Sequence, residues 1–239
     1  MWVFAEYEAT TLFSLKPASA TASGGKTLLV PTPFAIKMAL VDALCRLEGA
    51  AVAQIEWKWL RQVTIALKPA PAVVVNNTFI KVLKPRRNPA EPGSMDAGYF
   101  GRTITYREYA QLVGAFGIAF QVETMEQAEK LALLLWNINY LGKRGSFIQA
   151  VRPPDWHDTL PQAYIPVTTQ PSFDIRAILT QLDDVGEEVA FEYIDIYSDK
   201  KNIQLGKQRI LHHVALPYQL VSSSRGYSYY QVITDDSLS

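Results

Sequence analysis

The sequence predicts an α+β fold in which a ferredoxin-like domain carries a long insertion and is followed by a small β-rich part. Up to residue 152 the segments read strand, helix, strands, strand, helix and strand, which is the order of a split β-α-β unit. Residues 77–101 form an insertion too long for an ordinary connection in a compact domain. After the break at Pro153-Pro154, residues 153–239 read mostly as strands. We therefore expect a domain over 1–152 and a C-terminal β-rich subdomain over 153–239.

Composition favours a soluble chain that folds without cross-links. The 239 residues are 49% hydrophobic and include one cysteine, so no internal disulfide is expected. The 23 basic and 23 acidic residues cancel, so any sign of a nucleic-acid partner must come from where charges are placed. No signal peptide and no uninterrupted apolar run of about 18 residues are visible, so we expect no membrane contact and a cytoplasmic location.

Local signals place the elements of the first half. Residues 2–15 mix aromatic, β-branched and polar side chains as a strand does. Thr32 can cap a helix and Pro33 fits its first position, which predicts a helix from Pro33 to about Leu47, ended by Gly49. Strand-like runs follow over 63–67 and 73–75 on the near side of the insertion.

The remaining elements follow the insertion. Strands are predicted over 102–109, 117–123 and 146–151. Thr124 and Gln127 form a capping box for a helix over 127–139, with Gly142 as its stop. In the C-terminal part we expect a short helix over 175–182 and strands over 189–197, 209–220 and 226–233.

The insertion and the strand behind it are rich in cations and aromatic rings. Between residues 77 and 107, six positive and two negative side chains give a local charge of +4, and Tyr99, Phe100, Tyr106 and Tyr109 lie within or just behind this stretch. The six cations are Lys81, Lys84, Arg86, Arg87, Arg102 and Arg107. Cations neutralise phosphates and aromatic rings stack on unpaired bases, a combination that favours single-stranded RNA. The alternative is a solvated loop whose charges serve solubility.

Two glycine-containing loops offer further cations. In Gly142-Lys143-Arg144-Gly145 the glycines allow close approach of a phosphate, although the same pattern suits a helix stop with two exposed cations. The loop over 23–27, Ser-Gly-Gly-Lys-Thr, supplies Lys26. Its spacing does not match a nucleotide-binding phosphate loop, so nucleotide hydrolysis is excluded.

Histidine chemistry has little support in this sequence. His212 and His213 are neighbours on a predicted strand and would point to opposite faces, which disfavours joint metal ligation. His157 has acidic neighbours but reads as a surface histidine. We expect no catalytic residue, no metal and no cofactor.

Several short motifs, in order, resemble a known family. Residues 101–109, GRTITYREY, resemble the "REY" strand of CRISPR-associated protein family five. An apolar strand (116–122), a helix (127–139) and the segment 140–146, YLGKRGS, which is similar to the family's "YLGR(K/R)S", follow as they do there. The Pro-rich turn into the first helix at 30–36 fits as well.

The resemblance covers about residues 2–149, and the first helix departs from it because residues 37–40 lack the family's glycine. It implies a ferredoxin-like, RRM-like RNA-binding domain whose residues 77–101 form a protruding thumb β-hairpin. Such a chain is a non-catalytic subunit of a type I Cascade complex. It would hold the 5′ handle of the crRNA, contact the large subunit, set its thumb against the first backbone subunit, and meet target DNA only through the complex.

The residues expected to bind RNA combine the cationic and aromatic positions above: Lys26, Lys81, Lys84, Arg86, Arg87, Tyr99, Phe100, Arg102, Arg107, Lys143 and Arg144. One branch of the family cleaves precursor RNA with a Tyr, Lys and His cluster, but here Lys143 is followed by Arg144, which implies binding without cleavage. Three alternatives stay open: a guide-processing endoribonuclease of the same superfamily, a metabolic enzyme on a ferredoxin-like scaffold, and a protein scaffold that binds no RNA.

Overall fold

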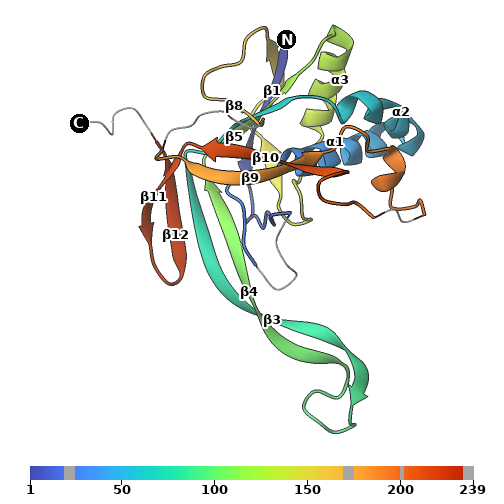
Figure 1. Ribbon diagram of the computed structural model, residues 1–239, viewed down its shortest axis with the longest axis vertical. Helices are drawn as coiled ribbons and strands as arrows, with labels where there is room; N and C mark the ends of the chain where they lie inside the picture. Colours follow the sequence, from blue (N-terminus) through green and yellow to red (C-terminus); the bar gives the residue numbers. More distant parts are fainter. Residues whose placement is uncertain (19–24, 169–174, 200–201, 234–239) are drawn as a thin grey trace.

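The computed structural model describes residues 1–18, 25–168, 175–199 and 202–233 (Figure 1). Within these residues the chain is a mixed α/β protein with three α-helices and strands that pair antiparallel in three sheets. The α+β class predicted from the sequence is confirmed.

The first sheet forms the platform of the molecule. Its strands are β1 (Trp2–Ala9), β2 (Ile65–Lys68), β5 (Phe116–Gln121), β6 (Ile148–Ala150), β7 (Asp155–His157) and β8 (Ile165–Pro166). They lie in the order β6-β1-β5-β2-β8, and β7 pairs with β1 beside β6. Strands from beyond residue 153 therefore extend the sheet that the first 150 residues build.

Three helices cover one face of this sheet: α1 (Pro33–Glu48), α2 (Ala50–Leu60) and α3 (Met125–Trp136). Both predicted caps are confirmed, since Thr32 accepts a hydrogen bond from the Ala35 amide and Thr124 forms a capping box with Gln127. Helix α2 is not among the predicted elements. Gly49 does end α1, but its φ of 88° turns the chain straight into a second helix.

Alternate residues of β1 face different layers, as a strand requires. Val3 and Tyr7 are fully buried in the main core beneath the helices, and the Tyr7 hydroxyl donates to the Leu135 carbonyl at 2.7 Å. Phe4 points to the other face, where it packs with Ala119 in a second, smaller cluster. The platform thus has apolar side chains on both of its faces.

The segment that contains β7 and β8 covers the second face. The ring of Phe4 lies 5.5 Å from His157 and 5.2 Å from Tyr164, centroid to centroid. Gly117 lies so close to Tyr164 that a Cβ there would be 2.4 Å from the phenolic oxygen. This face is therefore closed, and bases cannot stack on it as they do on the open sheet of an RRM.

The second sheet contains a hairpin that projects from the body (Figure 1). Its strands are β3 (Ala72–Ala90), β4 (Gly98–Val113), β11 (Tyr218–Ser223) and β12 (Tyr227–Val232), in the order β11-β12-β3-β4. The predicted insertion is not separate from the strands that flank it, because β3 and β4 pair continuously from Ala72↔Val113 to Pro85↔Phe100. Strand β12 pairs only with the first five residues of β3, so the outer part of the hairpin stands alone.

The third sheet is a two-stranded ribbon of β9 (Ile178–Val185) and β10 (Arg209–Leu216). The predicted helix over 175–182 is wrong, because eight residue pairs of the ribbon override the local preference. The predicted strand over 189–197 is also wrong. A single 3-10 turn, η1 (Phe191–Tyr193), lies there instead, and the carbonyl of Val189 accepts hydrogen bonds from the side chains of Trp57 and Arg61.

Further boundaries differ from those predicted, and the strand expected over 2–15 ends at Ala9. The strand expected over 209–220 is split at Pro217 into β10 and β11, because proline supplies no amide for a continuous ladder. Helix α3 ends at Trp136, so Gly142 lies in the turn beyond it with a φ of 72° rather than at the end of the helix.

A buried ion pair fastens the ribbon to α1. Lys37 is 2% exposed, its ammonium lies 2.8 Å from Oδ1 of Asp184, and it donates to the Arg61 carbonyl at 2.8 Å. Burial lowers the pKa of Lys37, and the neighbouring Asp184 opposes that shift. One side chain therefore joins α1, the end of α2 and β9.

Replacing Lys37 by Met should lower the free energy of unfolding by about 3–5 kcal/mol, because Asp184 would lose its cation at a largely buried position. The double variant Lys37→Met/Asp184→Leu should recover much of this loss, since it removes both charges. Urea unfolding followed by tryptophan fluorescence measures both. A loss below about 1 kcal/mol for Lys37→Met would show that the pair does not hold the ribbon.

Candidate nucleic-acid interface

A cationic pocket of about 440 Å³ lies where α1 begins. Its charged lining is entirely positive among the described residues: Lys16, Arg107, Lys143 and Arg209. Its apolar lining consists of Leu15, Phe34, Ala35 and Met38. Positive charge beside apolar and aromatic surface can hold phosphates and unpaired bases together.

Residues from distant parts of the sequence meet in this pocket. Arg107 comes from β4 and Lys143 from the turn after α3, and the structure brings these two predicted residues to one site. Lys16, Phe34 and Arg209 line it with them, but no sequence pattern predicts that role. Arg209 in particular is the first residue of β10 and reaches the site only through the packing of the ribbon on α1.

The guanidinium of Arg209 is held in a fixed position. Its Nε lies 2.6 Å from Oδ2 of Asp183, whose side chain is 1% exposed, and its Cζ lies 4.4 Å from the centroid of the Phe34 ring. A carboxylate and an aromatic face together fix the planar group at little further entropic cost. Arg209 therefore presents preorganised donors to the pocket.

The first turn of α1 adds a second attraction for anions. The opening amides of a helix lack partners within the helix, and the helix dipole makes this end positive. Thr32 satisfies the Ala35 amide, and the first turn carries no acidic residue. Both Thr32 and Ala35 line the pocket, so a phosphate there would meet a helix N-terminus as well as four cationic side chains.

Lys26 lies at the base of the hairpin, on a loop that Glu108 holds in place. The buried Glu108 accepts from the Thr27 amide at 2.9 Å, lies 3.1 Å from Lys26 Nζ, and donates its own amide to the Gly25 carbonyl at 2.6 Å. The hydrogen bond and charge of Glu108 raise the pKa of Lys26, which is largely exposed. Ser23 and Gly24, in the same predicted loop, lie outside the described residues.

The predicted cations of the hairpin fall into two kinds. Arg86 and Arg102 lie 3.3 and 3.2 Å from the carboxylate of Asp96, so they brace the tip. The other three, Lys81, Lys84 and Arg87, are exposed. None of these five lines the cationic pocket.

One face of the hairpin carries a row of exposed apolar side chains. Cross-strand partners share a face, and the pairs Phe79↔Tyr106, Lys81↔Ile104, Leu83↔Arg102 and Pro85↔Phe100 fall on the same one. On it Phe79, Leu83, Ile104 and Phe100 are 57–74% exposed. Tyr99, predicted to bind RNA with Phe100, is 59% exposed near the tip.

The turn that carries Lys143 also carries Arg144. It is closed by the Ser146 amide, which donates to the Lys143 carbonyl at 3.1 Å, and it contains Gly142 and Gly145, both with positive φ. Arg144 is exposed but does not line the pocket. Of this pair, Lys143 is the one positioned for a ligand in the pocket.

The three histidines lie apart from the pocket. His157 is on β7 beside Asp155, while His212 lies 3.8 Å from Asp184 and His213 contacts Gln181. Among the described residues, no three His, Cys, Asp or Glu side chains form a group that could hold a metal ion. No helix in the described parts of the chain is long and apolar enough to span a membrane.

Comparison with known proteins confirms the resemblance found in the sequence. No protein-family model matches the chain. A curated relative, "CRISPR-associated protein Cas5" of Archaeoglobus fulgidus, is 24% identical over 205 residues, which cover 83% of this chain and 86% of the relative.

Two solved structures are similar to this fold. A CRISPR protein from Archaeoglobus fulgidus is 15% identical with a TM-score of 0.41, and the match covers 98% of this chain and 92% of that one. A chain from a "CRISPR RNA-guided surveillance complex" is 15% identical with a TM-score of 0.42, covering 90% of each.

Replacing Gly25 by Ala should detach the loop from the hairpin base, because the added Cβ would lie 2.1 Å from the Tyr106 carbonyl oxygen. We expect a loss of about 1–3 kcal/mol in unfolding free energy. Hydrogen exchange should speed up at the amides of Thr27 and Glu108. Unchanged protection at both amides would show that the loop is not held by this contact, and Gly226→Ala, where nothing lies within 4 Å, is the matched control.

Proposed function

We propose that this chain is an RNA-binding subunit of a CRISPR RNA-guided surveillance complex in the cytoplasm. In this proposal the cationic pocket at the start of α1 binds the 5′ handle of the guide RNA. The similarity to a curated Cas5 protein supports membership of such a complex. The observation that carries the site is the convergence of Lys16, Arg107, Lys143 and Arg209 on a helix N-terminus beside an aromatic ring.

The arrangement favours single-stranded RNA over a duplex. The pocket is concave, and Phe34 and Met38 within it are half-buried, so an unpaired base could pack against them while its phosphates meet the cations. We further propose a ferredoxin-like platform, supported by the strand order β6-β1-β5-β2 and by helices after β1 and β5. Because the segment with β7 and β8 covers the sheet face opposite the helices, RNA would bind at the edge of the platform.

The hairpin serves in this proposal as the thumb that contacts the first backbone subunit. Phe79, Leu83, Phe100 and Ile104 form an exposed apolar face on a ribbon that projects from the body (Figure 1). Apolar side chains gathered on a projecting element mark a surface for protein contacts. We assign no residues to the large subunit, and target DNA would be met only through the assembled complex.

We propose binding without cleavage. None of the described residues that line the pocket is a histidine, aspartate or glutamate, the groups that most often transfer protons in catalysis. This supports a binding subunit over a guide-processing endoribonuclease or a metabolic enzyme. Co-expression with neighbouring genes, followed by sequencing of the RNA that co-purifies, tests the proposal, and absence of a guide RNA with a defined 5′ end would contradict it.

The double variant Arg107→Ala/Lys143→Ala should weaken binding of a handle-length single-stranded RNA about tenfold or more, because two phosphate contacts are lost. The slope of log K against log salt should fall by about 0.7 for each contact. Fluorescence anisotropy across a KCl series measures both. The control Lys58→Ala/Arg225→Ala removes two exposed cations elsewhere and should change neither. Equal weakening in both variants would mean that charge attracts RNA without a defined site.

The double variant Phe100→Ser/Ile104→Ser should leave the free energy of unfolding within about 0.5 kcal/mol of the parent, because both side chains are largely exposed. Recovery of the backbone subunit in the co-purified complex should fall. The control Leu220→Ser/Val221→Ser changes two half-exposed side chains on β11 and should leave recovery intact. Undiminished recovery with Phe100→Ser/Ile104→Ser would exclude this face as the contact.

A further inference from the structure

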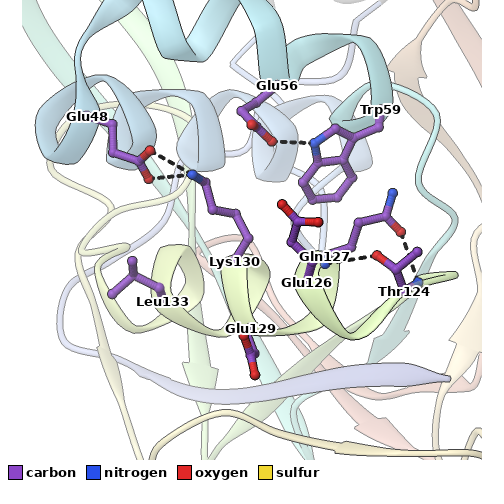
Figure 2. A pocket seen from close by; sticks show the side chains of 9 residues that line it. All are labelled: Glu48, Glu56, Trp59, Thr124, Glu126, Gln127, Glu129, Lys130 and Leu133. Atoms are coloured by element: carbon purple, nitrogen blue, oxygen red, sulfur yellow. Dashed lines mark hydrogen bonds and ion pairs between the residues drawn. The ribbon is translucent and has the colours of Figure 1, made fainter.

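The helical side of the platform carries a groove of about 620 Å³ between α3 and the ends of α1 and α2 (Figure 2). It lies at the opposite end of α1 from the cationic pocket. That helix runs from Pro33 to Glu48, about 24 Å at 1.5 Å per residue. The groove and the cationic pocket are therefore separate surfaces.

The charge of the groove is opposite to that of the pocket. The described residues that line it include four carboxylates and a single ammonium, that of Lys130. The carboxylates belong to Glu48, Glu56, Glu126 and Glu129. Lys130 is paired with Glu48 at 2.7 Å, and Glu56 accepts from the indole of Trp59 at 2.5 Å (Figure 2). A second hollow of about 320 Å³ shares Trp59 and Gln127 with the groove and adds Glu123.

Three of these carboxylates have no partner within the part of the chain that the structure describes: Glu123, Glu126 and Glu129 have no side-chain hydrogen bond or ion pair there. They lie before and within the first turns of α3. Their charges help to stabilise the helix N-terminus, but that role does not require them to border a groove. The groove therefore has negative charge that the chain itself does not neutralise.

Apolar surface continues from the groove along α3 and the end of α1. Leu133, which lines the groove, is 48% exposed, and Trp136 one turn further is 50% exposed. Leu47, next to Glu48 at the end of α1, is 43% exposed. Exposed aromatic and aliphatic side chains beside unneutralised charge are typical of surfaces that bind proteins.

We propose that this acidic groove docks a partner protein through an amphipathic segment with lysines or arginines on one face and apolar side chains on the other. Charge complementarity selects that occupant, since cations would meet Glu123, Glu126 and Glu129 while apolar groups cover Leu133 and Trp136. The same charge repels the phosphates of nucleic acid. The inference does not depend on the function proposed for the cationic pocket.

A fluorescein-labelled 18-residue amphipathic helical peptide, with leucines on one face and lysines and arginines on the other, probes the groove by fluorescence anisotropy. The variant Glu123→Lys/Glu126→Lys should weaken its binding about tenfold or more, since two attractions become repulsions. The control Asp158→Lys/Glu188→Lys changes net charge equally at exposed positions elsewhere and should leave the affinity unchanged. Equal weakening in the control would overturn the proposal.

A second variant keeps every charge and removes apolar surface. Leu133→Ser/Trp136→Ser should also weaken the peptide about tenfold, and circular dichroism confirms that each variant is folded. Unchanged peptide affinity in this variant would mean that the peptide is attracted by charge alone, and it would contradict docking in the groove.

Two further readouts distinguish other occupants. The variant Arg107→Ala/Lys143→Ala should bind the peptide as tightly as the wild-type chain, and a loss of affinity there would place the peptide in the cationic pocket. Sedimentation should show the same oligomeric state for the wild type and for Glu123→Lys/Glu126→Lys. A wild-type oligomer lost in that variant would identify a second copy of this chain as the occupant and contradict the proposal.

Discussion

The buried ion pair between Lys37 and Asp184 is the contact on which the cationic pocket depends. It holds the β9–β10 ribbon against α1. Because Lys37 is only 2% exposed, its ammonium would be buried without a counter-charge if the ribbon moved away. The preceding residue, Asp183, orients Arg209 over Phe34. The two adjacent carboxylates therefore have different roles. Asp184 fixes the ribbon to α1, and Asp183 positions Arg209, which lies on the ribbon.

The net charge of the chain is zero, but its charges are distributed unevenly over the surface. Helix α1 starts beside a pocket lined by four cationic side chains and ends at a groove lined by four carboxylates and one ammonium, so its two termini border surfaces of opposite charge. Cations near the start oppose the helix dipole, and they are tolerated because other elements contribute them from outside the helix. A polyanion is therefore attracted to one end of the body and repelled from the other.

The sequence predicts those features that depend on contacts between residues close together in the chain. Thr32 and Thr124 predict the starts of their helices because an N-cap side chain bonds to a backbone amide only three residues later. The amino-acid composition predicts the hairpin insertion and marks Arg107 and Lys143 as candidate cations. It does not predict that these two side chains line the same pocket. Helix α2 is not predicted because Gly49 is typical of a helix end, and only its φ of 88° in the structure shows that the chain resumes a helix at once.

Long-range pairing accounts for the other differences. Residues 178–185 have no strong strand pattern of their own and become β9 because β10 supplies eight cross-strand partners. Arg209 gives no local sign of a binding role, and its position follows from tertiary packing alone. The ferredoxin-like platform, the limits of the C-terminal subdomain and the RNA-binding residues stay predictions.

The projecting hairpin has a mechanical consequence. Its root is braced by β12 and, at Asn77, by the carbonyls of Arg225 and Gly226, and the 13 residues from Thr78 to Ala90 extend beyond that brace, a contour of roughly 43 Å at about 3.3 Å per residue. An arm of this length works as a lever, because a rotation of about 5° at its root moves its end by roughly 4 Å. The backbone geometry at Asn77 and Gly226, where this brace ends, thus determines the direction in which the hairpin projects.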